Sequence, residues 1–286
     1  MGFGGSSGML SIIIPVYNSS KYLNECLASV KVASESFNFP LEVIIVDDGS
    51  KDDSLKIAYQ WSDQWSKVRV FSHSQNRGVG AARNTGLSKA QGEWILWLDS
   101  DNRINPNGLQ RIANAISTTP SVDAWILAMD LIDEQGKKFG SFYEDRVKVD
   151  PEMQLVQQPF SLLIGNFIDV FSVIRKSIAL MEPFDETLPV QLEDWDMWIR
   201  ILFRQRARVS FIRDAIGQYR QNPAGGSSKH RLNNPEYLDT LIQIYCKILL
   251  SSRQMNLSPT AIQSVILALR QASYYALQLI DLPVNK

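Results

Sequence analysis

From residue 9 to about residue 131, short apolar runs alternate with stretches whose apolar side chains recur at helical spacing. Short apolar runs bounded by turn residues are typical of buried strands, and a period of three to four residues is typical of helices. This alternation predicts a parallel sheet with helices on both faces. The predicted strands cover residues 10–16, 41–46, 68–72 and 94–98, and the predicted helices cover residues 21–32, 53–65 and 80–90.

Local signals predict the remaining elements. Asn105 is expected to be the N-cap of a further helix with Pro106 at its first position, and Gly92 is expected to terminate the helix at 80–90. Gln135 and Gly136 have the composition of a tight turn. Beyond them the pattern is irregular, with strands expected at 123–133, 169–175 and 208–212 and a helix at 193–203.

The tail from residue 234 predicts two helices, because Asn234-Pro235 and Ser258-Pro259 are matching helix starts. Apolar side chains follow at helical period in both segments. We expect these stripes to pack against the main body; a partner, an acceptor or a membrane surface is the alternative. The stripes are Leu238, Leu241, Tyr245 and Ile248, then Ile262, Ile266, Leu269 and Leu277.

Polar side chains follow the predicted strands at the point where each strand ends. In parallel sheets these carboxyl ends share one edge, where ligands bind. We therefore expect the three clusters to form one site. They are Tyr17 and Asn18 after the first strand, Asp47 and Asp48 after the second, and Asp99 and Asp101 after the fourth.

Composition narrows the class of protein. The 286 residues include 29 Lys+Arg and 30 Asp+Glu, so no charge excess favours nucleic acid as a partner. No apolar run approaches the roughly 18 residues that span a bilayer. We expect a soluble, cytoplasmic protein, with contact at the inner face of the membrane left open. Cys26 and Cys246 are expected to be reduced and buried in apolar patterns, and residues 1–8 are a leader or a remnant of cloning.

Asp99-Ser100-Asp101 is the sharpest chemical signal. A diphosphate is a poor leaving group until a divalent cation neutralises its charge. Mg²⁺ takes one or two protein carboxylates and leaves its other positions for phosphate and water. An Asp-x-Asp sequence at a strand end suits this arrangement, although an isolated one is more often a solvated turn.

The motifs around this acidic pair favour a binding site over a solvated turn. The runs SIIIPVYN, EVIIVDDGS and NRGVGAARNTGLSKAQGEWILWLDSD occur in this order. They resemble the nucleotide-binding half of family 2 glycosyltransferases, closely over residues 10–102 and more loosely to residue 220. The resemblance implies a GT-A fold: an α/β, Rossmann-like, mostly parallel central sheet flanked by helices, here with a C-terminal helical extension. It implies a nucleotide-binding half at 9–133, an acceptor and catalytic half at 134–232, and the extension at 233–286.

The resemblance also implies roles for individual residues. Asp101 corresponds to the ligand of Mn²⁺ or Mg²⁺, and Asp99 to a contact with the ribose, the sugar or the metal. Asp47 corresponds to the position that binds the uracil edge, which favours UDP over GDP or dTDP. The remaining donor-binding positions are Pro15, Val16 and Tyr17 against the base, Asn76 and Arg83 near the base and pyrophosphate, and Ser100 beside the acidic pair.

In the second half, Asp194 corresponds to the catalytic base of an inverting transfer. A carboxylate there takes the proton of the acceptor hydroxyl. Glu193 and Asp196 are attributed to the favourable field at a helix N-terminus. Gly165-Asn166 is expected to shape the pocket, and Arg220 to bind diphosphate oxygens. His230 is more simply a surface histidine than a further metal ligand.

Two other functions were weighed against transfer. A dinucleotide-dependent dehydrogenase requires G-x-G-x-x-G after the first strand, where this chain has PVYNSS. A degenerate module that binds a sugar nucleotide or glycan is disfavoured because Asp101 and Asp194 are both present. The prediction is a metal-dependent inverting transfer from a nucleotide-sugar donor to an unknown hydroxyl acceptor, in surface polysaccharide or glycoconjugate synthesis.

Overall fold

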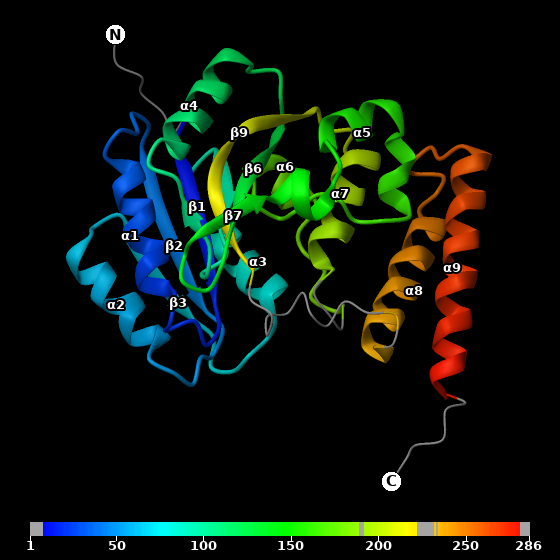
Figure 1. The fold of residues 1–286 in the computed structure, drawn as a ribbon, viewed down its shortest axis with the longest axis horizontal. Helices are drawn as coiled ribbons and strands as arrows, with labels where there is room; N and C mark the ends of the chain where they lie inside the picture. The colour runs from blue at the N-terminus through cyan, green and yellow to red at the C-terminus, as the bar shows by residue number, and fades with distance from the viewer. Residues whose placement is uncertain (1–7, 189–191, 222–231, 233, 281–286) are drawn as a thin grey trace.

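A computed structural model of the chain describes residues 8–188, 192–221, 232 and 234–280. Within them a nine-stranded sheet runs in the order β3-β2-β1-β4-β8-β6-β9-β5, with β7 paired to β6. Helices surround the sheet, and α8 and α9 stand together at the end of the molecule opposite α1 and α2 (Figure 1).

The first half is the parallel α/β unit expected from the apolar pattern. β1 lies between β2 and β4, and β3 pairs with β2, all in parallel. Every residue of β1 and β2 is buried, which requires cover on both faces of the sheet. The elements are β1 (Leu10–Val16), α1 (Leu23–Ser34), β2 (Leu41–Asp47), α2 (Ser54–Gln64), β3 (Val68–Ser72), α3 (Val79–Lys89) and β4 (Trp94–Trp97).

In the second half the strand directions are mixed. β8 is antiparallel to β4 and β6, whereas β6 and β9 are parallel. The antiparallel β8 matters for the site, because its amino-terminal end meets the carboxyl ends of the parallel strands. The elements are β5 (Arg103–Ile104), α4 (Gly108–Thr118), β6 (Ala124–Ile132), β7 (Lys138–Ser141), the π-helix η1 (Phe142–Val147), α5 (Pro151–Gln157), the 3₁₀ helix η2 (Pro159–Leu163), β8 (Ser172–Arg175), α6 (Lys176–Met181), α7 (Glu193–Phe203) and β9 (Val209–Arg220).

Two helix-boundary predictions were wrong. The helix expected from Asn105 begins at Gly108, with Asn107 as N-cap, because the Asn105 side chain instead donates to the carbonyl of Ala215 at 2.9 Å. Gly92 does not end α3, which stops at Lys89; its N–H donates to Ser11 Oγ at 2.8 Å, at the entrance to β4. In both cases a tertiary contact uses the residue that a local signal assigned to a helix end.

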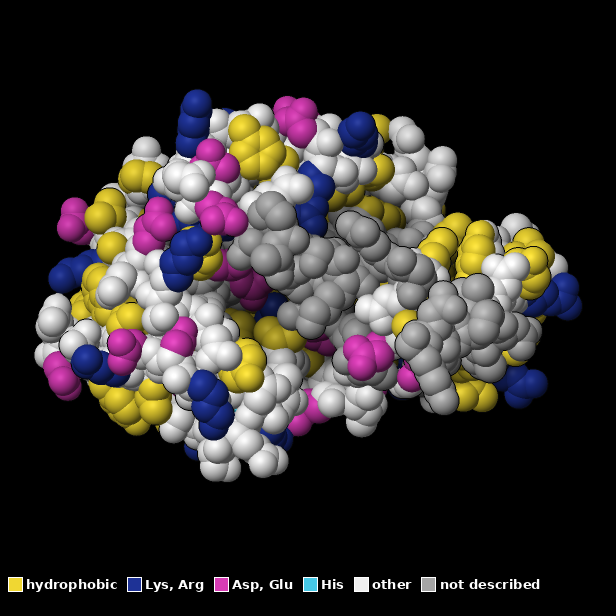
Figure 2. Space-filling view, turned by 60° about the horizontal axis from the view of Figure 1, so that its bottom comes forward, with side chains coloured by type: hydrophobic (Ala, Val, Ile, Leu, Met, Phe, Trp, Pro, Cys, Tyr) yellow, Lys and Arg dark blue, Asp and Glu magenta, His cyan; other side chains and the backbone are white. Residues whose placement is uncertain are grey.

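The tail forms α8 (Pro235–Leu250) and α9 (Pro259–Ile280). Both predicted starts are confirmed: the Asn234 side chain accepts from the N–H groups of Glu236 and Tyr237, and Ser258 Oγ accepts from the N–H of Ala261. The α8 stripe is buried, and the ring of Tyr245 packs edge-on against Trp195 of α7. The α9 stripe is only partly covered. Leu277, expected inside, is exposed, and apolar side chains are visible at this end of the molecule (Figure 2).

None of the described helices is both long enough and apolar enough to cross a bilayer. Cys26 and Cys246 are free thiols, of which only Cys26 is fully buried. Its sulfur lies 3.8 Å from the carbonyl oxygen of Asp99, so α1 packs directly beneath the acidic pair.

Candidate functional site

A cavity of about 1010 Å³ opens where the strand ends meet. Acidic side chains are visible in a hollow near the middle of this face of the molecule (Figure 2). Nearly all of the predicted site residues that are described line this cavity. They are Pro15, Val16, Tyr17, Asn76, Arg83, Asp99, Ser100, Asp101, Asp194 and Arg220.

Asp47 does not line the cavity, and its neighbour Asp48 does. The side chain of Asp47 is 1% exposed and accepts from the N–H of Ser50, closing the turn after β2. Asp48 accepts from the N–H of Gly78 at 2.8 Å and pairs with His73 Nδ1 at 2.7 Å. Asp48 therefore holds the start of α3 beside the cavity. The composition of the turn alone did not show which of Asp47 and Asp48 would do so.

Apart from Asp47, the side chains expected to hold a base line the cavity. Tyr17 is 47% exposed, which leaves a ring face open for stacking. Asn76 is also exposed, in the loop before α3. Ser100 is buried and its hydroxyl donates to Ser19 Oγ at 2.7 Å. Ser100 thus links the acidic loop to the segment that follows Tyr17.

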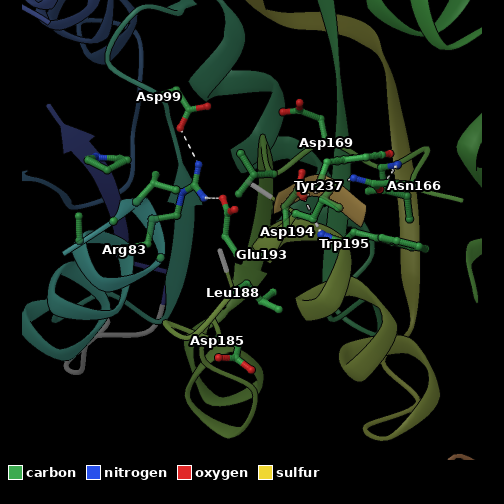
Figure 3. A pocket seen from close by; sticks show the side chains of 18 of the residues that line it. Arg83, Asp99, Asn166, Asp169, Asp185, Leu188, Glu193, Asp194, Trp195 and Tyr237 are labelled. Carbon is green, nitrogen blue, oxygen red and sulfur yellow. Dashed lines mark hydrogen bonds and ion pairs between the residues drawn. The ribbon is translucent and has the colours of Figure 1, made fainter. Parts of the chain in front are cut away.

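Arg83 lies at the centre of an ion-pair network that spans both halves of the domain. Its Nη2 is 2.8 Å from Asp99 Oδ1, and its Nη1 donates to Glu193 Oε1 (Figure 3). Arg83 is 3% exposed and Glu193 is 7% exposed. The two neighbouring carboxylates raise the pKa of Arg83 despite its burial. Glu193 therefore has a specific cationic partner, beyond the favourable field at a helix N-terminus.

Arg220 does not present its guanidinium to the cavity in the way that we expected. Its Nε donates to the carbonyl of Asp101 at 3.0 Å, and Nη1 donates to the carbonyls of Asp133 and Glu134. Its Nη2 pairs with Glu25 Oε2 at 2.6 Å. Because these contacts occupy the guanidinium donors within the protein, Arg220 holds the loop that carries Asp101 in place.

The carboxyl groups of Asp101 and Asp194 are both held in surroundings that favour protonation. Burial, followed by the nearby charge of Asp99, raises the pKa of Asp101 to about 7. Burial also raises the pKa of Asp194, with Glu193 and Asp169 adding to the shift. Asp194 Oδ1 accepts from the N–H of Trp195 at 2.7 Å and from Asn166 Nδ2 at 3.3 Å. The Asn166 contact supports the expectation that this segment shapes the pocket.

Sequence reasoning missed the part of the cavity wall formed by Asp169 and by Arg146 of η1, next to Tyr219 of β9. Asp169 precedes β8, and the antiparallel pairing of β8 with β4 brings it to the edge where Asp99 leaves β4. Arg146 of η1 lies over the ring of Tyr219, 4.6 Å from its centroid. All three residues line the cavity. An acid next to an apolar run was the available signal for Asp169, but it indicates this edge only if the strand direction is known.

Among the described residues, no cluster of three or more His, Cys, Asp or Glu side chains has the geometry to hold a metal ion. His230 lies outside the described residues. Asp99 and Asp101 fit a hard divalent cation in the character of their oxygen donors. A cation there would take most of its ligands from a bound diphosphate and water.

Comparison with known proteins identifies the family. The model of glycosyl transferase family 2 matches residues 11–179, more than half of the chain. The chain belongs to this family. An uncharacterized glycosyltransferase of Rickettsia bellii is 32% identical over 233 residues, which are 80% of this chain and 32% of that protein. This family 2 chain thus spans about a third of the length of that relative.

Solved structures show that the fold is the expected GT-A fold. TarS 1–349 of S. aureus in complex with UDP-GlcNAc has a TM-score of 0.68 at 22% identity, over 96% of this chain and 76% of that one. The mannosyltransferase PcManGT of Pyrobaculum calidifontis, in complex with GDP-Man and Mn²⁺, has a TM-score of 0.58 at 18% identity, over 95% and 78%.

Proposed function

We propose that this family 2 chain transfers a sugar from a nucleotide diphosphate donor, with UDP favoured, to a hydroxyl acceptor with inversion at the anomeric carbon. One observation carries the proposal: the Asp99-Asp101 pair and Asp194 line the same cavity, linked through Arg83 and Glu193. A donor phosphate group and an acceptor hydroxyl can therefore be handled on two sides of one space. Surface polysaccharide or glycoconjugate synthesis is the process to which we assign the reaction.

On the donor side, Pro15, Val16, Tyr17 and Asn76 supply the nucleotide contacts. Stacking of a base on an aromatic ring contributes about 1–3 kcal/mol. UDP is favoured by the motif resemblance and by the UDP-GlcNAc complex of TarS. Of the two adjacent acids after β2, Asp48 lines the cavity and Asp47 does not, so Asp48 is the better placed to contact a base edge.

Asp101, with Asp99 beside it, would hold Mn²⁺ or Mg²⁺. When bound, the cation neutralises charge on the diphosphate leaving group. Arg83 restrains Asp99, and Arg220 restrains the loop of Asp101 through its carbonyl. Both carboxylates are thereby kept at the cavity wall. The Mn²⁺ complex of PcManGT supports this assignment.

Asp194 is the proposed base. Two donors, the N–H of Trp195 and the amide of Asn166, contact its Oδ1 and orient the carboxyl group. Its raised pKa makes it a stronger proton acceptor than an ordinary aspartate once ionised. It takes the acceptor proton as the oxygen attacks the anomeric carbon opposite the departing diphosphate.

Thermal shift measured with UDP, GDP and dTDP, each with Mn²⁺, tests the donor side. A ligand at 100 times its Kd stabilises a protein by about 2.7 kcal/mol. We expect UDP to raise Tm most. Donor hydrolysis with and without Mn²⁺ separates the enzyme from a non-catalytic binding module: a module would give the Tm shift without any turnover.

Replacing the proposed metal ligand should abolish the metal dependence of donor binding. With Asp101→Ala we expect Mn²⁺ to add little to UDP affinity, because one of the few protein ligands of the cation is lost. Isothermal titration of UDP with and without Mn²⁺ measures the effect. An unchanged response to Mn²⁺ would refute the ligand role, and UDP affinity without metal serves as the internal control.

On acidification, the turnover number should begin to fall at a higher pH than it would if the base were an ordinary aspartate. A general base acts when it is ionised. Because the pKa of Asp194 is raised, this carboxyl group stays protonated at pH values above the ordinary aspartate pKa of about 4. As pH decreases through that raised pKa, kcat should decrease. The measurement is kcat against pH at saturating donor and Mn²⁺. An acidic limb near pH ~4 would contradict the assignment.

A further inference from the structure

We propose that Asp169 binds a hydroxyl group of the transferred sugar and that its carboxylate selects a neutral sugar over an acidic one. This inference rests on the proposed function and specifies its donor class. Asp169 was not among the site residues expected from the sequence.

The backbone and one oxygen of Asp169 are fixed by the protein. Its Oδ1 accepts from the N–H of Phe171 at 2.8 Å. Its own N–H donates to the hydroxyl oxygen of Tyr143 at 3.4 Å, and its carbonyl accepts from Trp198 Nε1 at 3.2 Å. No hydrogen-bond donor among the described residues contacts Oδ2. A rigidly held carboxylate therefore faces the cavity with one oxygen still able to accept a hydrogen bond.

Asp169 lines the same cavity as the proposed metal-binding pair and the proposed base. In an inverting transfer the ring sits between the leaving diphosphate and the base. Asp99 and Asp101 are on the proposed diphosphate side, and Asp194 is the proposed base. Asp169 is close enough to add to the raised pKa of both Asp101 and Asp194. Figure 3 shows Asp169 projecting toward the space that Asp99 and Asp194 also border.

The acidic side chains beside Asp169 favour a neutral sugar ring over an anionic one. Asp169 shares the cavity with several other acidic side chains, and Arg83 is already paired with two of them. Arg146, the nearby cation on the other side, lies over the rings of Phe142 and Tyr219, and its buried Nη1 has no hydrogen-bond partner among the described residues. A sugar hydroxyl can donate to Asp169, whereas a sugar carboxylate would be repelled. The acidic side chains in this part of the cavity include Asp99, Asp101, Asp169, Glu193 and Asp194.

The test compares the affinities of UDP and UDP-sugars, with Mn²⁺, for wild type and Asp169→Asn. The sugar nucleotides are UDP-glucose, UDP-galactose, UDP-GlcNAc and UDP-glucuronate, measured by isothermal titration. An asparagine oxygen can still accept from Phe171. We expect the Kd of the preferred neutral UDP-sugar to rise about tenfold to a hundredfold, the range for a lost charged hydrogen bond. The Kd of UDP should change by less than about threefold, because UDP lacks the sugar that Asp169 is proposed to bind.

The matched control is Glu144→Gln, which removes a carboxylate from an exposed position of η1 outside the cavity. We expect it to leave every Kd unchanged. Selectivity gives a second readout: wild type should bind UDP-glucuronate more weakly than the preferred neutral sugar, and Asp169→Asn should reduce that difference. If Asp169→Asn lowers Tm, Asp169→Glu, which keeps the charge but moves it by one methylene, should show the same loss of sugar affinity.

Other results would refute the sugar contact, the selectivity or the proposed function. Unchanged UDP-sugar affinity in both variants, or an equal loss for UDP and UDP-sugar, would refute the sugar contact. Equal binding of UDP-glucuronate and the neutral sugars by wild type would refute the selectivity. Wild type that binds none of the nucleotides would overturn the proposed function itself, which is distinguishable from failure at Asp169 alone.

Discussion

Asp194→Asn should reduce turnover by about 10²–10⁴-fold, the range that a positioned general base contributes. The amide cannot accept the acceptor proton, yet its oxygen can keep the hydrogen bonds from Trp195 and Asn166. Because the base contacts the acceptor and not the nucleotide, UDP affinity should stay the same. The measurement pairs kcat for transfer or donor hydrolysis with the Kd of UDP.

Asp239→Asn is the matched control for this variant. It makes the same chemical change in the first turns of a helix, but at an exposed position of α8 that does not line the cavity. Its turnover should match that of wild type. A parallel decrease of turnover and UDP affinity in Asp194→Asn would show instead that Asp194 holds the fold of the site.

Arg83→Ala should destabilise the protein by about 3 kcal/mol, at the lower end for removing one partner of a buried ion pair. Without Arg83, the buried carboxylate of Glu193 loses its cation, and so does Asp99, whose side chain is 32% exposed and more easily hydrated. Turnover should fall as well, because both halves of the site lose their shared contact. Urea denaturation measures the loss of stability.

An exposed arginine of similar pairing provides the control. Arg213 also contacts two carboxylates, Asp150 and Glu152, but its side chain is 54% exposed. Arg213→Ala should cost no more than about 1 kcal/mol, as for surface ion pairs. Arg83→Lys should fall between wild type and Arg83→Ala, because an ammonium group cannot bridge two carboxylates with a planar fork. Equal losses for Arg83→Ala and Arg213→Ala would refute the central role of Arg83.

The Arg83 contacts also explain how two distant motifs can act together. Asp99 belongs to the acidic pair after β4, and Glu193 immediately precedes the proposed base at the start of α7. The acidic pair and the start of α7 are therefore joined through one buried side chain. The same guanidinium therefore positions both ends of the proposed reaction.

Much of the site followed from order along the chain. Apolar runs separated by helical patterns implied parallel strands, and parallel strands end at a shared edge. The pairs Tyr17/Asn18, Asp47/Asp48 and Asp99/Asp101 were therefore expected to lie together. Tyr17, Asp48, Asp99 and Asp101 line one cavity, whereas Asn18 and Asp47 do not. Helix α7 was predicted with its observed bounds because its apolar period is strong and its first turn is acidic.

Partnerships between distant residues had no such signal. The pairing of Arg83 with Glu193 joins residues 110 positions apart, and no local pattern distinguishes that glutamate from one that only favours a helix start. Arg220 had the chemistry for phosphate, but carbonyl groups of the loops around it take up its donors. Choosing between such partners requires knowing which loops pack together.

The chain alone therefore determined the α/β fold class, the sheet edge at which the strand ends meet and the acidic groups on it, because strand and helix periodicity depends on consecutive residues. Only the tertiary structure decided which of Asp47 and Asp48 reaches the cavity, and that Asp169 joins the site. The physical reason is strand direction: the antiparallel pairing of β8 with β4 brings the beginning of one strand beside the end of another.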